Sequence, residues 1–244
     1  MSRTPVHSVQ LESHADHVRL RLRRPERYNV LDINLLAELA VSLDDARGES
    51  LPLVLDGEGR VFSLGADVRE LAGFSSQAAS TYSRLGQQTV AALESWPSVT
   101  IARLSGYAMG AGLELALGCD ILVADPDVRI GLPGLAWALV PCFGGLRRLY
   151  HRVGSGVSSD LFLRGMVLDG PAALEAKLVD RVLASNDELD ALIREVAEFS
   201  PAAVAAIRDL RLRRYGTVDM GAEAELFAQP FVSGECQRRL QALL

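Results

Sequence analysis

A run of small residues next to a glutamate is the part of the sequence best suited to chemistry. Gly110, Ala111 and Gly112 follow a predicted strand at residues 101–104 and start a short predicted helix that carries Glu114. The first N–H groups of a helix have no partner within the helix and lie at the positive end of its dipole, so they bind an anionic oxygen. Small side chains leave these N–H groups uncovered. The pattern predicts an oxyanion donor, the Ala111 N–H, beside an acid/base carboxylate, Glu114.

The same residues also fit a structural role, in which the small residues form a tight turn and Glu114 complements the helix dipole. A capping box would place Ser or Thr where Ala111 stands, which disfavours this alternative. A dinucleotide-binding fingerprint is excluded, because Leu115 occupies the position of its third glycine.

A second junction of strand, loop and helix is predicted over residues 61–71. Asp67 is a good N-cap for the short helix that follows the loop. The N–H of Leu64, in the loop, is predicted to be a second oxyanion donor that faces the one at Ala111. Two such donors converging on one point suit acyl-transfer and enolate chemistry.

Strands and helices alternate along the first half of the chain. Hydrophobic periodicity predicts strands at residues 17–23, 52–56, 100–104, 121–124 and 128–130, and helices at residues 32–48 and 77–95. This alternation predicts an α/β fold with a mostly parallel sheet and right-handed crossovers. Ligands of such sheets bind beyond the C-terminal ends of the strands, where both junctions lie.

The second half begins with a loop and continues as helices. Residues 131–145 are rich in Pro and Gly and are predicted to line a pocket. Helices are expected at residues 146–153, 157–164, 170–177, 188–199, 202–214 and about 219–244, the last interrupted near Pro230. We divide the chain into a core of residues 1–185 and a helical region of residues 186–244. Surplus apolar faces in the helical region predict contacts between subunits.

Composition narrows the functional class. The 244 residues carry a net charge of -6 with both signs interspersed, which disfavours nucleic-acid binding. No apolar run reaches the roughly 18 residues that a membrane span needs, and the N-terminus lacks the apolar region of a signal peptide. We therefore expect a cytoplasmic protein. The three cysteines are widely spaced and have no histidine at zinc-site spacing, so no disulfide or metal site is predicted.

With these features assembled, the sequence resembles the crotonase superfamily, also called the enoyl-CoA hydratase/isomerase family. The matching stretches are RPERYNVL (24–31), LDGEGRVFSLGADVREL (55–71), SGYAMGAGLELALGCDILVAD (105–125), FGGLRRLYHRVG (143–154) and LRGMVLDGPAALEAKLVDRV (163–182). The resemblance implies a crotonase-like spiral of ββα units with a helical C-terminal trimerisation region. It also implies a homotrimer or a dimer of trimers.

The resemblance implies an acyl-CoA thioester substrate, as in fatty acid metabolism, with coenzyme A as part of the substrate and no separate cofactor. The thioester oxygen would accept the N–H groups of Leu64 and Ala111, so that an enolate is stabilised. The residues expected along the substrate are Arg27, Val30, Leu64, Gly65, Ala66, Asp67, Gly110, Ala111, Gly134 and Cys142.

Two positions depart from the family pattern. Hydratases of the family use two glutamates; Glu114 matches the first, and Gly134 stands where the second is expected. With a single carboxylate, double-bond isomerisation with Glu114 as the acid/base is the reaction we predict. Other branches place a catalytic aspartate or tyrosine at or near the position of Cys142. A packing role for Cys142 is favoured over a catalytic one, because free cysteine packs as a small hydrophobe.

Several alternatives stay open at this point. One is hydration by a single glutamate. Another is a different enolate reaction, hydrolysis or decarboxylation, on an acyl-CoA or a carrier-bound acyl group. A third, motivated by Gly134 and Cys142, is a CoA-binding scaffold with little catalysis.

Overall fold

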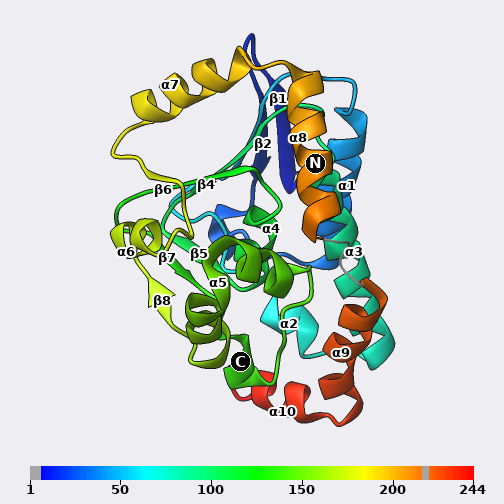
Figure 1. Cartoon of the computed structure of the whole chain (residues 1–244). Coiled ribbons are helices and arrows are strands. Elements are labelled where there is room, and N and C mark those ends of the chain that lie inside the picture. The colour runs from blue at the N-terminus through cyan, green and yellow to red at the C-terminus, as the bar shows by residue number, and fades with distance from the viewer. Residues whose placement is uncertain (1–6, 216–219) are drawn as a thin grey trace.

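The computed structural model describes residues 7–215 and 220–244, and within these ranges it contains two β-sheets surrounded by helices (Figure 1). The larger sheet has the strand order β1-β2-β3-β4-β6-β9. Its strands are β1 (Val9–Ser13), β2 (Val18–Leu22), β3 (Leu53–Gly57), β4 (Thr100–Leu104), β6 (Ile121–Ala124) and β9 (Arg181–Val182). Only the pairing of β1 with β2 is antiparallel among these described strands, which confirms the mostly parallel sheet.

The smaller sheet brings the two predicted junctions together. It consists of β5 (Tyr107–Met109), β7 (Arg129–Gly131) and β8 (Val167–Leu168), and β5 leads directly into α4 (Ala111–Ala116). The loop residue Ser63 pairs with β5 through two hydrogen bonds: its N–H donates to the Tyr107 oxygen and its oxygen accepts the Met109 N–H, both at 3.0 Å. The loop after β3 therefore lies against the start of α4.

The helices are placed by caps and apolar stripes. In α1 (Ile33–Asp45) the Asp32 side chain accepts the Leu35 N–H at 2.8 Å, and Leu35, Leu36, Leu39 and Leu43 are buried at helical spacing. The other helices are α2 (Val68–Leu71), α3 (Ser76–Glu94), α5 (Gly145–Leu163), α6 (Gly170–Glu175), α7 (Asn186–Ala197), α8 (Pro201–Tyr215), α9 (Met220–Val232) and α10 (Glu235–Gln241). The described residues also form two short 3₁₀ helices, η1 (Pro25–Arg27) and η2 (Pro133–Trp137).

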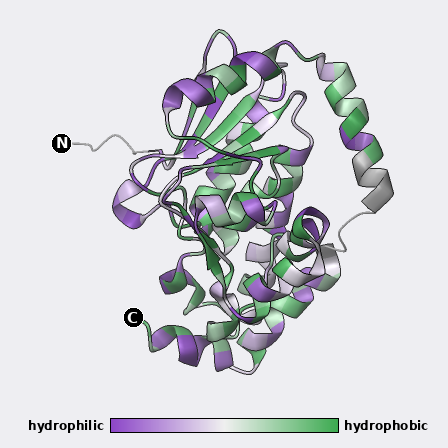
Figure 2. Cartoon of the chain, turned by 60° about the vertical axis from the view of Figure 1, so that its left-hand side comes forward, coloured by the Kyte–Doolittle hydropathy of each residue, from purple (hydrophilic) through white to green (hydrophobic). Residues whose placement is uncertain are grey.

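Apolar side chains cover both faces of the large sheet. One face contributes to the main core, together with α1, α3 and α4. The other face packs against α7, where Leu189, Leu192, Ile193 and Val196 meet Val54, Ile101 and Val123. The strands of the sheet accordingly carry mainly hydrophobic residues (Figure 2). The helices α9 and α10 lie at the opposite end of the molecule from α7 (Figure 1).

The structure differs from the sequence-based expectation at several elements. The strands β1, β5, β8 and β9 were not predicted. The break expected at Gly154 is confirmed, because Gly154 has a non-helical backbone (φ 74°, ψ 179°) that kinks α5 into two helical parts. The predicted start of the last helix at residue 219 lies outside the described residues. Its interruption falls at Gly234 rather than at Pro230, which is tolerated near the end of α9.

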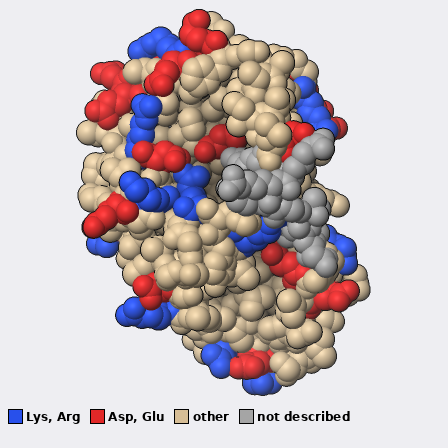
Figure 3. All heavy atoms as spheres, in the orientation of Figure 1, with Lys and Arg blue, Asp and Glu red and all other residues tan. Residues whose placement is uncertain are grey.

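The surface shown in Figure 3 carries charges of both signs in small groups. No helix in the described part of the chain combines the length and the apolar character that a membrane span requires. On α8 the side chains of Ile207 and Leu210 are 69% and 66% exposed. They are suitable for subunit contacts, and the trimer stays a prediction.

A buried arginine holds α8 against the sheet. The Arg208 guanidinium pairs with Asp120 and donates hydrogen bonds to the backbone oxygens of Trp96 and Ser98. Arg208→Ala should remove the charged partner of Asp120 and the donor to these two backbone oxygens, and lower the free energy of unfolding by about 3 kcal/mol. Urea unfolding measures this loss. Arg164→Ala, which removes an exposed ion pair with Asp160, is the control. If the two variants unfold at the same urea concentration, Arg208 does not anchor α8.

Candidate active site

An apolar cavity of about 1000 Å³ lies at the junction of the small sheet, the start of α5 and the helix α9. Eight of the predicted site residues line it: Val30, Leu64, Ala66, Gly110, Ala111, Glu114, Gly134 and Cys142. Three predicted residues that the structure also describes, Arg27, Gly65 and Asp67, are not part of its lining. The structure therefore brings most of the predicted site together in one place.

Glu114 is buried in the wall of this cavity and is held by the N-terminus of α5. Its Oε1 atom accepts the N–H groups of Phe143 at 2.8 Å and Gly145 at 2.9 Å. Its Oε2 atom accepts the Cys142 N–H at the longer distance of 3.2 Å. The segment before α5 thus holds the carboxyl group in place from one side. Glu114 also lines the cavity.

Burial raises the pKa of Glu114 to about 7, the nearby charge of Glu223 adds to this effect, and the backbone N–H groups oppose it. Desolvation is the largest cause of this rise. A carboxyl group with a pKa near neutrality gains and loses a proton readily, which suits acid/base catalysis.

The two predicted oxyanion segments are in contact, because Gly65 has no side chain. A Cβ at Gly65 would lie 2.5 Å from the Met109 oxygen and 3.2 Å from the Ala111 nitrogen, and the residue has φ of 91°. Only glycine permits both the backbone conformation and this close approach. The loop and the start of α4 therefore present their backbones to the same part of the cavity.

The donor predicted at Leu64 needs correction. Its N–H is already engaged, because it donates to the Tyr28 oxygen at 3.1 Å. Among the described residues, the N–H of Ala66 in the same loop has no assigned acceptor, and Ala66 lines the cavity. Ala111 is the first residue of α4, so its N–H has no partner within the helix. The available donors are those of Ala66 and Ala111.

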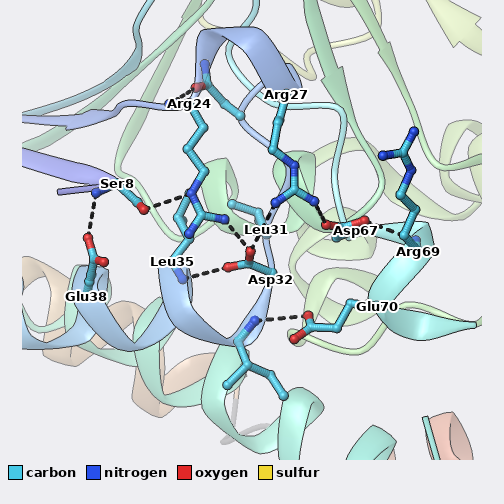
Figure 4. A network of polar contacts seen from close by, with 12 residues as sticks. Ser8, Arg24, Arg27, Leu31, Asp32, Leu35, Glu38, Asp67, Arg69 and Glu70 are labelled. Carbon is cyan, nitrogen blue, oxygen red and sulfur yellow. Dashed lines mark hydrogen bonds and ion pairs between the residues drawn. The ribbon is translucent and has the colours of Figure 1, made fainter. Parts of the chain in front are cut away.

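Arg27 and Asp67 belong to a polar network beside the cavity (Figure 4). Arg27 forms an ion pair with Asp67, which also caps α2 by accepting the Arg69 N–H at 3.0 Å. Asp32 caps α1 and pairs with Arg24. This network fixes the starts of α1 and α2, and the substrate contacts predicted for Arg27 and Asp67 stay predictions.

Cys142 is buried, and burial raises the pKa of its thiol well above the ordinary value. A thiol that stays protonated is a poor nucleophile. Its backbone has a clearer role, since the Cys142 oxygen accepts hydrogen bonds from Ser83 at 2.7 Å and Gln87 at 3.2 Å. These bonds tie the loop that holds Glu114 to α3.

A second carboxylate, missed by the sequence analysis, also lines the cavity. Glu223 on α9 accepts the N–H of Gly144 and a hydrogen bond of 3.1 Å from Gln87. Desolvation raises its pKa above the ordinary value. One signal in the sequence points to it: Glu223 lies four residues before Phe227, on the buried stripe that continues to Phe231. A carboxylate on the apolar stripe of a helix is unusual and marks a candidate site residue.

Comparison with known proteins agrees with this geometry. Residues 13–242 match the model of the enoyl-CoA hydratase/isomerase family. The chain belongs to the enoyl-CoA hydratase/isomerase family. It is 33% identical to a probable enoyl-CoA hydratase of Bacillus subtilis, over 88% of each protein. It is 35% identical to the 2,3-dehydroadipyl-CoA hydratase of Escherichia coli, over 78% of this chain and 75% of that protein.

Solved structures of the family share the fold. The crystal structure of an enoyl-CoA hydratase from Thermoplasma volcanium superposes with a TM-score of 0.83 at 27% identity, over 98% of both chains. The crotonase-like α/β fold with a helical C-terminal region is thereby confirmed. The chain is an enzyme of the enoyl-CoA hydratase/isomerase family. An acyl-CoA substrate is consistent with the names of its relatives.

Proposed function

We propose that this protein is a hydratase of α,β-unsaturated acyl-CoA thioesters. The observation that carries the proposal is Glu114, a buried carboxyl group with a pKa of about 7 in the wall of an apolar cavity. Hydration requires a proton to be delivered to the α-carbon of the thioester, and Glu114 is suited to deliver it.

The thioester oxygen would accept the N–H groups of Ala66 and Ala111 in this proposal. Negative charge develops on that oxygen as an enolate forms, and two fixed donors stabilise it. The apolar lining of the cavity offers space for an acyl chain. The relatives named above support hydration, because the B. subtilis and E. coli proteins are both named as hydratases.

Double-bond isomerisation is the second candidate, favoured by Gly134. This residue lines the cavity but offers no carboxylate at the position where hydratases of the family are expected to have one. In this reaction Glu114 alone would take a proton from the α-carbon and return it to the γ-carbon, with the same oxyanion donors.

Mass spectrometry of products formed in isotopically labelled water separates the two reactions. The purified protein is given α,β-unsaturated and β,γ-unsaturated acyl-CoA esters. When the water carries heavy oxygen, hydration adds one labelled oxygen to the product, whereas isomerisation adds no oxygen and only moves the double bond. We expect the labelled hydroxyacyl ester. A product in which only the double bond has moved would establish isomerisation. If neither ester is changed, both candidate reactions are contradicted.

A further inference from the structure

Two carboxylates from distant parts of the chain share one segment of backbone. The N–H groups of Cys142, Phe143 and Gly145 donate to Glu114, and that of Gly144, between them, donates to Glu223. Four consecutive N–H groups at the start of α5 therefore hold one carboxyl group from α4 and one from α9. The positive end of the helix dipole lies at this point, which allows two acidic groups to approach one another.

Helix α3 fixes this arrangement from the other side. The Gln87 amide donates both to Glu223 at 3.1 Å and to the Cys142 oxygen at 3.2 Å, so one side chain links the second carboxylate to the loop that holds the first. Both carboxylates face the cavity. Glu223 thus belongs to the same polar cluster as Glu114 and is not an isolated acidic residue of α9.

We propose that Glu223 is the second carboxylate of the reaction and shares one proton with Glu114, which acts as the acid while Glu223 acts as the base. The hydrogen bonds assign the roles. Oε1 of Glu114 accepts two short N–H bonds, as a carbonyl oxygen does, whereas Oε2 accepts one long bond and suits the hydroxyl oxygen of the protonated group. Two carboxyl groups held by consecutive N–H groups favour a single shared proton, because two negative charges there would repel.

The inference rests on the proposed hydration and completes its proton balance. Glu223 removes a proton from a water molecule, whose oxygen forms a bond to the β-carbon. The π-electrons of the double bond move onto the thioester, whose oxygen carries the negative charge of the enolate. The enolate then takes the proton of Glu114 at its α-carbon. Water has been added, and the carboxylate pair again holds one proton, now on Glu223, which returns to Glu114 by transfer between the two groups.

The titratable groups around the pair do not compete for its proton, and one of them favours the assigned roles. Those that face it from the neighbouring elements are Tyr82 on α3, Cys142 before α5, Arg148 on α5 and Glu235 on α10. Burial raises the pKa of both Tyr82 and Cys142, so these two stay neutral when the pair titrates. Arg148 is paired with Glu94 at 2.7 Å, and its positive charge still lowers the pKa of Glu223, which favours Glu223 as the base. Glu235 is paired with Arg239 at 2.6 Å.

NMR titration of isotope-labelled glutamate carboxyl groups tests the pair without relying on turnover. In Glu223→Gln the transition of Glu114 should move to lower pH, because the neighbouring negative charge is gone while the hydrogen bond to Gly144 is retained. The control is Glu225→Gln on the same helix, since Glu225 is exposed and outside the cavity lining. An unshifted Glu114 transition in Glu223→Gln would overturn the proposal.

Kinetics test the role of Glu223 in the reaction. Glu223→Gln should lower kcat roughly 10²- to 10⁴-fold with little change in KM, and Glu223→Asp should restore part of the rate. If the wild type hydrates the esters and Glu223→Gln does so equally well, the pair is overturned and the hydratase proposal stands. If the wild type transforms no ester although the titrations are coupled, the hydratase proposal fails and the shared proton is supported.

Discussion

Replacing Glu114 by glutamine is expected to lower kcat roughly 10²- to 10⁴-fold. The amide has nearly the same shape as the carboxyl group but does not deliver a proton to carbon. The substitution changes only one atom of the carboxyl group. It leaves the cavity, the loop before α5 and the two oxyanion donors as they are, so substrate binding should survive. Steady-state kinetics with an α,β-unsaturated acyl-CoA ester measure the loss.

Thermal unfolding separates lost chemistry from lost binding in Glu114→Gln. A ligand that binds the folded state raises Tm, so the same ester should stabilise the variant and the wild type alike. Glu225→Gln, an exposed change on α9, controls for the loss of a carboxylate elsewhere. A Glu114→Gln enzyme with the wild-type kcat would remove Glu114 from the mechanism.

Gly145→Ala should disturb the same carboxyl group from the opposite side. A Cβ at this position would lie 2.4 Å from Cγ and 2.6 Å from Oε1 of Glu114, which is too close for either atom to stay in place. The Glu114 carboxyl group would have to move away from the start of α5 and give up its hydrogen bond to the Gly145 N–H. A displacement of this size at a reacting group costs about 10² in kcat.

Gly156→Ala is the matched control on the same helix. A Cβ at Gly156 would meet no atom within 4 Å, and alanine favours the helix more than glycine does. Gly156→Ala should therefore keep its activity and unfold at the wild-type temperature or above. Comparable activity in the two alanine variants would mean that the position of Glu114 does not limit the rate.

Much of the fold was predictable because it follows from local patterns. The alternating residues of β2, the buried run of β3 and the apolar stripes of α1 and α3 each have a clear period. The strands β5, β8 and β9 have only two or three residues, too few for a period to be recognised. The break at Gly154 was predictable, because glycine readily adopts the positive φ that ends the first helical part of α5 there.

The site was predictable where one segment supplies both position and chemistry. Ala111 and Glu114 lie on the same short helix, so their sequence spacing alone places the donor beside the carboxyl group. The N–H of Leu64 was wrongly predicted to be free, because its partner, Tyr28, comes from a distant turn. Glu223 was missed for the same reason: its contacts with Gly144 and Gln87 depend on tertiary packing.

The pH dependence of kcat/KM for hydration of an α,β-unsaturated acyl-CoA ester tests the central claim most directly. Glu114 must be protonated to act as the acid, and its pKa is about 7. Its proton is present below this pH and is lost above it, so kcat/KM should fall as the pH rises through about 7. A profile that is flat in this range, or that rises through it, would contradict the assignment of Glu114 as the proton donor.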